Sequence, residues 1–156
     1  MERIDRQFAS RAEAKGLRWT VTPSIEWAWS DAALLERMVT NLVSNAVLYT
    51  RQGGVLVSCR RRGTELLVQV WDTGPGFAVE HLGQVFETHF RGEPATDTDN
   101  GVGLGLAIVR QSALVLGLQL TVRTRPGHGS CFSLRVPVGL APPDAVARIA
   151  GELSRT

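Results

Sequence analysis

The chain has 156 residues, of which 44% are hydrophobic and 21% are charged, and its formal net charge at pH 7 is +2. This composition excludes a disordered or fibrous chain and fits one globular domain with a core of its own. The arginines are scattered apart from one triplet at residues 60–62, and neither a basic helix nor an aromatic-interleaved basic patch accompanies it, so we expect no nucleic-acid partner.

Cysteine use and hydropathy bear on where the chain works. Cys59 and Cys131 both fall in apolar, strand-like runs, so we expect small buried thiols. Two cysteines without a secretory signal favour a reducing compartment, and no run is apolar and long enough to span a bilayer. We therefore expect a cytoplasmic domain, monomeric when isolated and without direct membrane contact, and leave open whether its parent protein is anchored in the inner membrane.

The first predicted element is a short helix. Ile4, Phe8 and Ala12 lie at four-residue spacing and predict a helix that ends at Gly16. This helix is either an element of the domain or the end of a longer one.

Two strands are predicted next, at residues 17–22 and 25–29, around a turn. Trp27 and Trp29 share one face of the second strand. We expect these rings to pack rather than to stack on a ligand.

Residues 31–50 predict a long amphipathic helix. Its apolar residues recur at spacings of three and four: Leu34, Leu35, Met38, Leu42 and Ala46. Asn41 and Asn45 lie four residues apart, so their amides share one face of the helix. Either both amides satisfy local backbone groups, or they line a polar cleft and offer oxygens to a hard cation such as Mg²⁺.

A carboxylate ends the second strand of the next predicted pair. Residues 54–62 and 64–72 predict a hairpin around Gly63. In its second strand, alternate side chains share one face: Leu66, Val68, Val70 and Asp72. A carboxylate there is costly unless it is hydrogen-bonded, and the glycines of residues 73–77 let the backbone approach a ligand closely. Asp72 either accepts a hydrogen bond from an exocyclic amine such as that of adenine or caps an ordinary turn.

Three alternating glycines precede the last predicted helix. Gly101, Gly103 and Gly105 lead into an apolar helix to about residue 116, and they expose N–H groups and the positive end of the helix dipole, which suits phosphates. The pattern is neither a Rossmann fingerprint nor a P-loop, because the preceding run is polar and no Gly-Lys-Ser/Thr follows. Residues 93–100 are polar and are expected to be mobile.

Two strands, at residues 119–124 and 130–138, close the predicted fold around a glycine-rich turn. The tail from residue 140 has two prolines and a weak helical pattern. No internal repeat or low-complexity tract interrupts this order.

Five segments occur in the order of the N, G1, F and G2 boxes and the closing strand of sensor histidine kinases: NLVSNAVLYT, DTGPGF, VFETHFRG, GVGLGLAIV and GHGSCF. Residues 17–138 thus resemble the catalytic ATP-binding domain of those kinases, in the superfamily that includes gyrase-type, Hsp90-type and MutL-type ATPases. The resemblance implies the Bergerat (GHKL) fold, an α/β two-layer sandwich with a mixed, mostly antiparallel sheet, helices on one face and ATP between the layers. It divides the chain into the tail of a preceding dimerisation helix (1–16), the ATP-binding domain (17–139) and a C-terminal linker or peripheral helix (140–156).

The resemblance also implies roles for single residues. Asn45 would ligate Mg²⁺, with Asn41 beside it as the second catalytic amide, and Asp72 would hold the adenine amine. Ser130 stands where the family usually has a threonine that helps to order water near the adenine. The residues expected at ATP are Asn41, Asn45, Tyr49, Asp72, Gly74, Gly76, Phe77, Phe86, Phe90, Arg91, Gly101, Val102, Gly103, Leu104, Gly105, Leu106 and Ser130.

One position in the helix predicted at residues 31–50 departs from the family pattern. Leu48 stands where a basic residue is common, which leaves a phosphate contact from that helix open, although Arg51 or Arg91 could substitute. The hydrolytic relatives have glutamate where this chain has Asn41, and an amide cannot act as a base toward water. The histidines lack the helical, acid-flanked setting of a phospho-acceptor: His81, His89 and His128.

The resemblance implies a kinase module. It would bind ATP with Mg²⁺ and pass the γ-phosphoryl group to a histidine on a separate dimerisation domain of its parent, which would in turn serve a response regulator. One alternative is a non-catalytic module whose lid reports ATP binding to a partner, which Leu48 favours. A hydrolytic ATPase of the gyrase or Hsp90 type is a further alternative that Asn41 disfavours.

Overall fold

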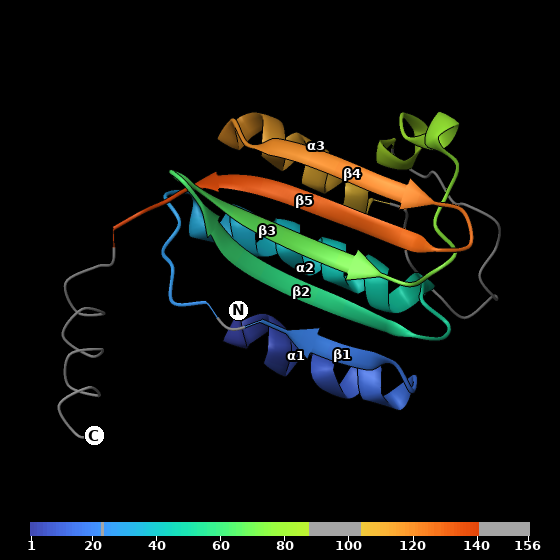
Figure 1. The fold of residues 1–156 in the computed structure, drawn as a ribbon. Coiled ribbons are helices and arrows are strands. Elements are labelled where there is room, and N and C mark those ends of the chain that lie inside the picture. Colours follow the sequence, from blue (N-terminus) through green and yellow to red (C-terminus); the bar gives the residue numbers. More distant parts are fainter. Residues whose placement is uncertain (23, 88–103, 141–156) are drawn as a thin grey trace, which may run out of the picture.

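Five strands form one sheet, and helices cover one of its two faces (Figure 1). The computed structural model describes residues 1–22, 24–87 and 104–140. In chain order the elements are α1 (Glu2–Ala14), β1 (Arg18–Val21), α2 (Ala32–Tyr49), β2 (Gly54–Arg62), β3 (Glu65–Asp72), the 3-10 turns η1 (Val79–His81) and η2 (Gln84–Phe86), α3 (Gly105–Leu116), β4 (Gln119–Arg125) and β5 (Gly129–Pro137). The strand order is β1-β2-β3-β5-β4, with β1 parallel to β2 and all other neighbours antiparallel. The predicted two-layer sandwich with a mixed, mostly antiparallel sheet is confirmed.

The helix α2 supplies the covering layer with its main apolar surface. Asp31 caps it, because its Oδ1 accepts a hydrogen bond of 2.8 Å from the backbone N–H of Leu34. The buried residues of α2 recur at helical spacing: Met38, Val39, Leu42, Val43, Ala46 and Val47. The predicted stripe is confirmed at its centre, while Leu34 and Leu35 near the first turn are only half-buried.

The predicted alternation in β3 is confirmed. Leu66, Val68 and Val70 are buried on the face that the helices cover. Asp72 is the next residue on this face and the last of the strand, and it is half-buried. The pleat of the strand therefore directs one carboxylate toward the helices at the end of the sheet.

The helix α1 shares this core. Ile4, Phe8 and Ala12 are buried with the side chains of α2 and the sheet. The Nζ of Lys15, just past the end of α1, donates hydrogen bonds of 2.7 and 2.8 Å to the carbonyl oxygens of Val47 and Leu48. Lys15 thereby satisfies orphan carbonyls at the C-terminal end of α2, where a cation is favoured. The assignment of residues 1–16 to the tail of a dimerisation helix stays a prediction.

The strand predicted at residues 25–29 is wrong. The segment makes a single isolated bridge, between Ala28 and Val138 at the end of β5. Trp29 is 77% exposed and Trp27 is 37% exposed, so these rings do not pack as expected. The alternation of apolar residues in this segment is typical of a half-buried strand. The segment nevertheless contacts only the end of β5, through two backbone hydrogen bonds, from Trp29 N–H to the Pro137 carbonyl and from Gly139 N–H to the Trp27 carbonyl.

Both cysteines are free thiols. Cys131 is buried as predicted, whereas Cys59 is only half-buried. Within the described ranges, no helix combines the length and hydropathy that a bilayer span requires. The predicted tail beyond residue 140 lies outside the described residues.

The burial of α1 can be tested by shortening its largest buried side chain. Phe8 is 1% exposed, so Phe8→Ala should lower the free energy of unfolding by about 3–5 kcal/mol through lost burial and the cavity that it leaves. Ile25→Ala is the matched control, because Ile25 is 86% exposed and its truncation should change the free energy by less than about 0.5 kcal/mol. Urea titrations measure both values. Equal stability of the Phe8→Ala variant and the wild type would contradict the packing of α1.

Candidate functional site

The carboxylate of Asp72 is held by backbone N–H groups through one oxygen. Its Oδ1 accepts hydrogen bonds from the N–H of Gly74 at 2.8 Å and from that of Ser130 at 3.3 Å. Its Oδ2 accepts none from the described part of the chain. Burial raises the pKa of this carboxyl above 3.8, and the two N–H donors offset part of the rise. The arrangement fixes the carboxylate and leaves one oxygen to accept a hydrogen bond from a ligand amine.

A buried hydroxyl lies beside this carboxylate. Thr50 is 0% exposed, and its Oγ1 has no hydrogen-bond partner among the described residues. A Cβ on Gly74 would lie 2.9 Å from Asp72 Oδ1 and 3.3 Å from Thr50 Oγ1, so Gly74 leaves open the space that the two groups share. An unpartnered buried hydroxyl is costly, and a water or a ligand atom in this space would satisfy it. Sequence reasoning missed Thr50, although it ends the segment NLVSNAVLYT.

The loop after β3 is fastened to the turn between β4 and β5. Gly76 has φ +59°, and a Cβ there would collide with the carbonyl oxygen of Arg125, so this position requires glycine. The N–H of Gly127 donates a 2.7 Å hydrogen bond to the carbonyl oxygen of Pro75. These contacts hold the loop rigidly next to Asp72.

Thr124 links the same loop to Ser130. Its Oγ1 accepts a hydrogen bond of 2.9 Å from the N–H of Phe77 and lies 3.2 Å from the Oγ of Ser130. Ser130 is thus both a backbone donor to Asp72 and a hydroxyl in a small polar network. No pattern in the sequence pointed to Thr124, because threonine is an ordinary strand residue. Its role depends on the pairing of β4 with β5.

The two asparagines of α2 meet the start of α3. A Cβ on Gly105 would lie 3.6 Å from both Oδ1 and Nδ2 of Asn45 and 3.8 Å from the Cβ of Asn41. The Nδ2 of Asn41 is buried without a partner in the described structure. Leu104, the N-cap of α3, offers no side-chain acceptor, so the first N–H groups of α3 lack a side-chain cap. Amides and helix N–H groups therefore converge at this end of the site, where they can serve an anion and its counter-cation.

The remaining predicted site residues lie at the end of α2, in the loop after β3, at the start of α3 and outside the described residues. Tyr49 is 41% exposed at the end of α2, and Phe77 packs partly buried against the core. Leu104 and Leu106 are half-buried at the start of α3. Five predicted residues lie outside the described residues: Phe90, Arg91, Gly101, Val102 and Gly103. The expected mobile segment at residues 93–100 lies there too.

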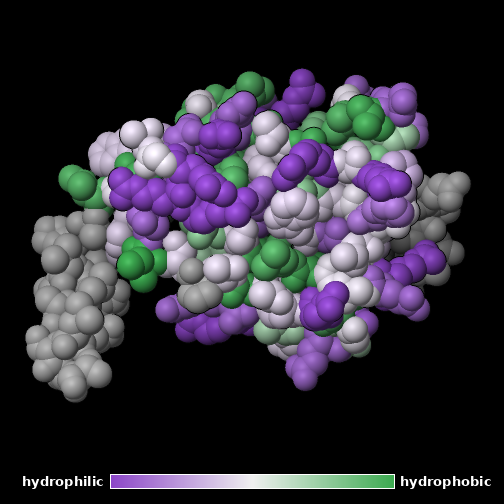
Figure 2. Space-filling view, in the orientation of Figure 1, coloured by the Kyte–Doolittle hydropathy of each residue, from purple (hydrophilic) through white to green (hydrophobic). Residues whose placement is uncertain are grey.

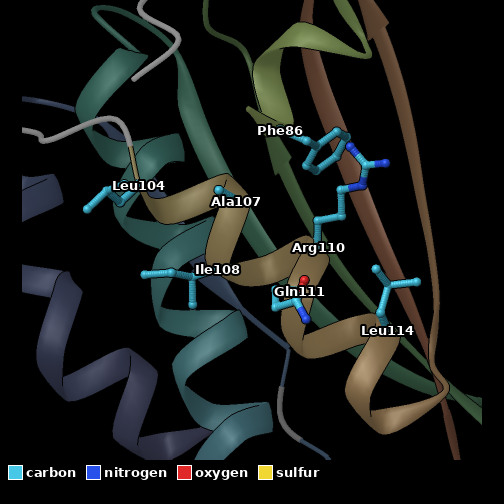
Figure 3. A pocket seen from close by; sticks show the side chains of 7 residues that line it. All are labelled: Phe86, Leu104, Ala107, Ile108, Arg110, Gln111 and Leu114. Atoms are coloured by element: carbon cyan, nitrogen blue, oxygen red, sulfur yellow. The ribbon is translucent and has the colours of Figure 1, made fainter. Parts of the chain in front are cut away.

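A groove of about 510 Å³ runs along α3, away from Asp72. Figure 3 shows Arg110 extending from α3 toward Phe86 of η2. The groove is lined by Phe86, Leu104, Ala107, Ile108, Arg110, Gln111 and Leu114. Phe86 and Leu104, both predicted to contact the nucleotide, line this groove together, and their role at the nucleotide stays a prediction.

The donor set suits a hard cation bound through oxygen. Among the described residues, no group of three His, Cys, Asp or Glu side chains comes together to hold a metal. The amide oxygens of Asn41 and Asn45 are ligands that Mg²⁺ accepts, and Mg²⁺ commonly takes its other ligands from water and phosphates. The residues present therefore fit Mg²⁺ that arrives with a phosphate ligand.

The burial of Asp72 predicts a pH dependence of stability. Because its folded-state pKa lies above the unfolded-state value, the folded protein holds the proton more tightly, and ionisation disfavours folding as the pH rises above 3.8. Asp72→Asn removes the ionisation and keeps an oxygen for both N–H donors. The difference in the free energy of unfolding, wild type minus variant, should therefore decrease as the pH is raised from below 3.8 to above the raised pKa of Asp72. Urea titrations at several pH values measure the difference, and a constant or rising difference would contradict the burial.

Comparison with known proteins agrees with this geometry. Residues 30–140 match the family model described as histidine kinase-, DNA gyrase B-, and HSP90-like ATPase. The chain is 41% identical over 120 residues to the sensor-like histidine kinase SenX3 of Mycobacterium tuberculosis, covering 76% of this chain and 29% of SenX3. It is 35% identical over 143 residues to the aerobic respiration control sensor protein ArcB of Escherichia coli, covering 85% of this chain and 18% of ArcB.

Solved structures of histidine kinases have the same fold. Full-length ShkA in complex with AMPPNP superposes with a TM-score of 0.75 and 29% identity, over 90% of this chain and 29% of ShkA. The mycobacterial sensor histidine kinase MprB superposes with a TM-score of 0.68 and 28% identity, over 90% of this chain and 95% of that one. The chain spans less than a third of the curated relatives SenX3 and ArcB. It belongs to the HATPase_c family of histidine kinase-, DNA gyrase B- and HSP90-like ATPases, as an ATPase catalytic domain of the sensor histidine kinase type.

Proposed function

We propose that this domain binds ATP with Mg²⁺ and donates the γ-phosphoryl group to a histidine on a separate dimerisation domain of its parent protein. The observation that carries the proposal is that two groups of polar residues lie on the helix-covered side of the sheet. One group contains Asp72 and Thr50, and the other brings Asn45 against the start of α3. ShkA, whose solved complex contains AMPPNP, has the same fold, which supports a nucleotide ligand here.

The base would bind at Asp72. Its Oδ2 can accept a hydrogen bond from an exocyclic amine, while Oδ1 is held by Gly74 and Ser130. The unpartnered hydroxyl of Thr50 can bind a water that bridges to the base. Gly76 and Thr124 already hold the loop after β3 in place. Little conformational entropy of this loop would therefore be lost when a ligand binds at Asp72.

The phosphates would bind between α2 and the start of α3. Asn45 supplies a metal ligand, and Asn41 offers an unpartnered amide N–H₂. When bound, Mg²⁺ would neutralise phosphate charge and orient the γ-phosphoryl group. The uncapped N–H groups of α3 favour negative charge nearby. Leu48 adds no charge, and Lys15 is already bonded to carbonyls at the end of α2.

The nucleophile would come from another domain. Asn41 cannot take a proton from water, which disfavours hydrolysis. His128 lies exposed in the turn between β4 and β5. His81 follows Glu80, but it ends the three-residue 3-10 turn η1, so neither of these histidines lies on an α-helix. Leu114 and Val115 on α3 are 69% and 66% exposed, and this apolar surface next to the groove suits an acceptor domain brought to the γ-phosphoryl group. A response regulator would be served through that acceptor.

A second candidate function is a non-catalytic module that binds ATP and reports it to a partner. The observation that favours it is Leu48, which stands where the family commonly has a basic residue. Binding of ATP is common to both functions, and only transfer of the phosphoryl group separates them.

Nucleotide binding tests the base pocket. Asp72→Asn should weaken ATP binding by at least about tenfold, because the amide presents a single acceptor oxygen and loses the charge assistance. Glu65→Gln is the matched control: it removes a carboxylate from the other face of the sheet, where Glu65 pairs with Arg135. Calorimetric titration with ATP and Mg²⁺ measures both. Equal affinity of Asp72→Asn and the wild type would refute the base pocket.

Phosphoryl transfer tests the kinase role. With γ-labelled ATP, the chain alone should take up no stable label, and the dimerisation domain of its parent should become labelled with acid-labile phosphate when it is added. Asn45→Ala should reduce the rate of labelling by about a hundredfold or more, because a metal ligand is lost. The amide control Gln119→Ala, on exposed β4, should label normally. An unlabelled partner despite proven ATP binding would favour the non-catalytic module.

A further inference from the structure

The face of the sheet that the helices leave open is basic. Val57 and Val70 face the helices, so residues of the opposite parity on the paired strands face away from them. This open face carries six exposed arginines: Arg18, Arg60, Arg62, Arg123, Arg125 and Arg135. In the strands of the described structure, Glu65 is the one acidic side chain on this face, and it pairs with Arg135 at 2.9 Å. The face therefore carries a clear excess of positive charge although the whole chain has a net charge of only +2.

An apolar spot lies among these arginines. The register aligns Leu56 with Trp71, and each is 37% exposed. Next to them, the guanidinium of Arg123 lies over the ring of Trp71, 5.2 Å from its centroid. Figure 2, which looks onto this face, shows hydrophilic side chains spread across it with smaller apolar areas between them. A small apolar centre with a charged rim is the common anatomy of a protein–protein interface.

A buried polar network fixes a second arginine on the same face. Gln69 is 3% exposed, and its Nε2 donates a 3.0 Å hydrogen bond to the Oγ of Ser133. Its Oε1 accepts a 3.0 Å hydrogen bond from Arg60. Arg60 and Arg123 are thus oriented before any partner arrives, so that less side-chain entropy is lost on binding.

We propose that this open face is a docking surface for an acidic protein domain, whose carboxylates pair with Arg60 and Arg123 around an apolar contact with Leu56 and Trp71. Guanidinium groups pair with carboxylates through two parallel hydrogen bonds, and Trp and Arg are the residues that most often dominate interface energetics. A single-stranded nucleic acid fits less well, because Trp71 is the one aromatic side chain that the described strands direct to this face, and Arg123 already covers its ring. A membrane fits less well, because the apolar side chains Leu56 and Trp71 of this face are each only 37% exposed and form a small spot rather than the broad apolar face of a membrane-binding helix.

The docking surface goes beyond the proposed function and does not depend on it. Asp72 and the asparagines of α2 lie on the helix-covered side of the sheet, whereas Arg60 and Arg123 lie on the other. A partner on the open face would leave the nucleotide site accessible. Binding of the partner and binding of ATP can therefore be measured separately on the same variants.

The test uses a short amphipathic peptide in which glutamates flank a stripe of leucines. Added to the whole isotope-labelled chain, it should shift the backbone amide signals of outward-facing residues such as Thr20, Leu56 and Trp71. The double variant Arg60→Gln/Arg123→Gln should lose about tenfold in affinity, as expected for the loss of charge-assisted contacts. The matched control Arg6→Gln/Arg37→Gln removes the same charge from exposed positions of α1 and α2 and should change the affinity by less than about twofold.

Several results would overturn the proposal. These are no binding of the peptide, an equal loss in the control variant, and tighter binding to phosphatidylglycerol-containing vesicles or to a DNA duplex than to the peptide. Backbone amide signals of the Arg60→Gln/Arg123→Gln variant that match the wild type away from the open face establish that it is folded, so its loss of peptide affinity would support the docking surface. Single variants at Leu56 and Trp71 to Gln should each weaken the peptide as well, which separates the apolar contact from charge alone.

Discussion

The burial of the apolar stripe of α2 against the central strands is the contact on which the rest of the structure depends. It selects which face of the sheet becomes the core, and the two-residue period of β3 then carries that choice along the strand to Asp72. The same packing fixes the rotation of α2, so that Asn41 and Asn45 meet the start of α3. Hydrophobic packing thereby decides where the polar groups of the site lie.

The site keeps polar groups that the fold itself does not satisfy. The hydroxyl of Thr50 and the Nδ2 of Asn41 are buried without partners in the described structure, and the carboxyl of Asp72 is held in surroundings that disfavour its charge. Each of these groups costs stability in the free domain. A ligand that supplies an amine at one end and phosphates with a cation at the other would recover that cost. The unsatisfied polar groups of the candidate site thus lower the stability of the free domain.

The two faces of the sheet differ in what they carry. The covered face carries the core and the proposed nucleotide site, while the open face carries oriented arginines around Trp71. Antiparallel sheets can leave one face to water, which agrees with the absence of a second helical layer among the described residues. Two properties distinguish the open face from an ordinary solvated surface: its excess of positive charge, and the buried hydrogen bonds of Gln69 that orient Arg60.

The sequence by itself determined the helices, the five strands, the pairing of β2 with β3 across Gly63, and the face of β3 on which Asp72 lies, because helix and strand periodicity are local properties. Which strands lie next to these in the sheet, β1 beside β2 and β5 beside β3, was decided by the tertiary structure. The sequence also indicated the asparagine pair and the glycines, which occupy recognisable segments. Only the tertiary structure decided that residues 25–29 lack a strand neighbour, that Thr50 and Thr124 belong to the site, and that Phe86 lines the groove on α3. These features depend on which distant segments are brought together, and ordinary threonines, tryptophans and arginines acquire their roles from neighbours that no local pattern encodes.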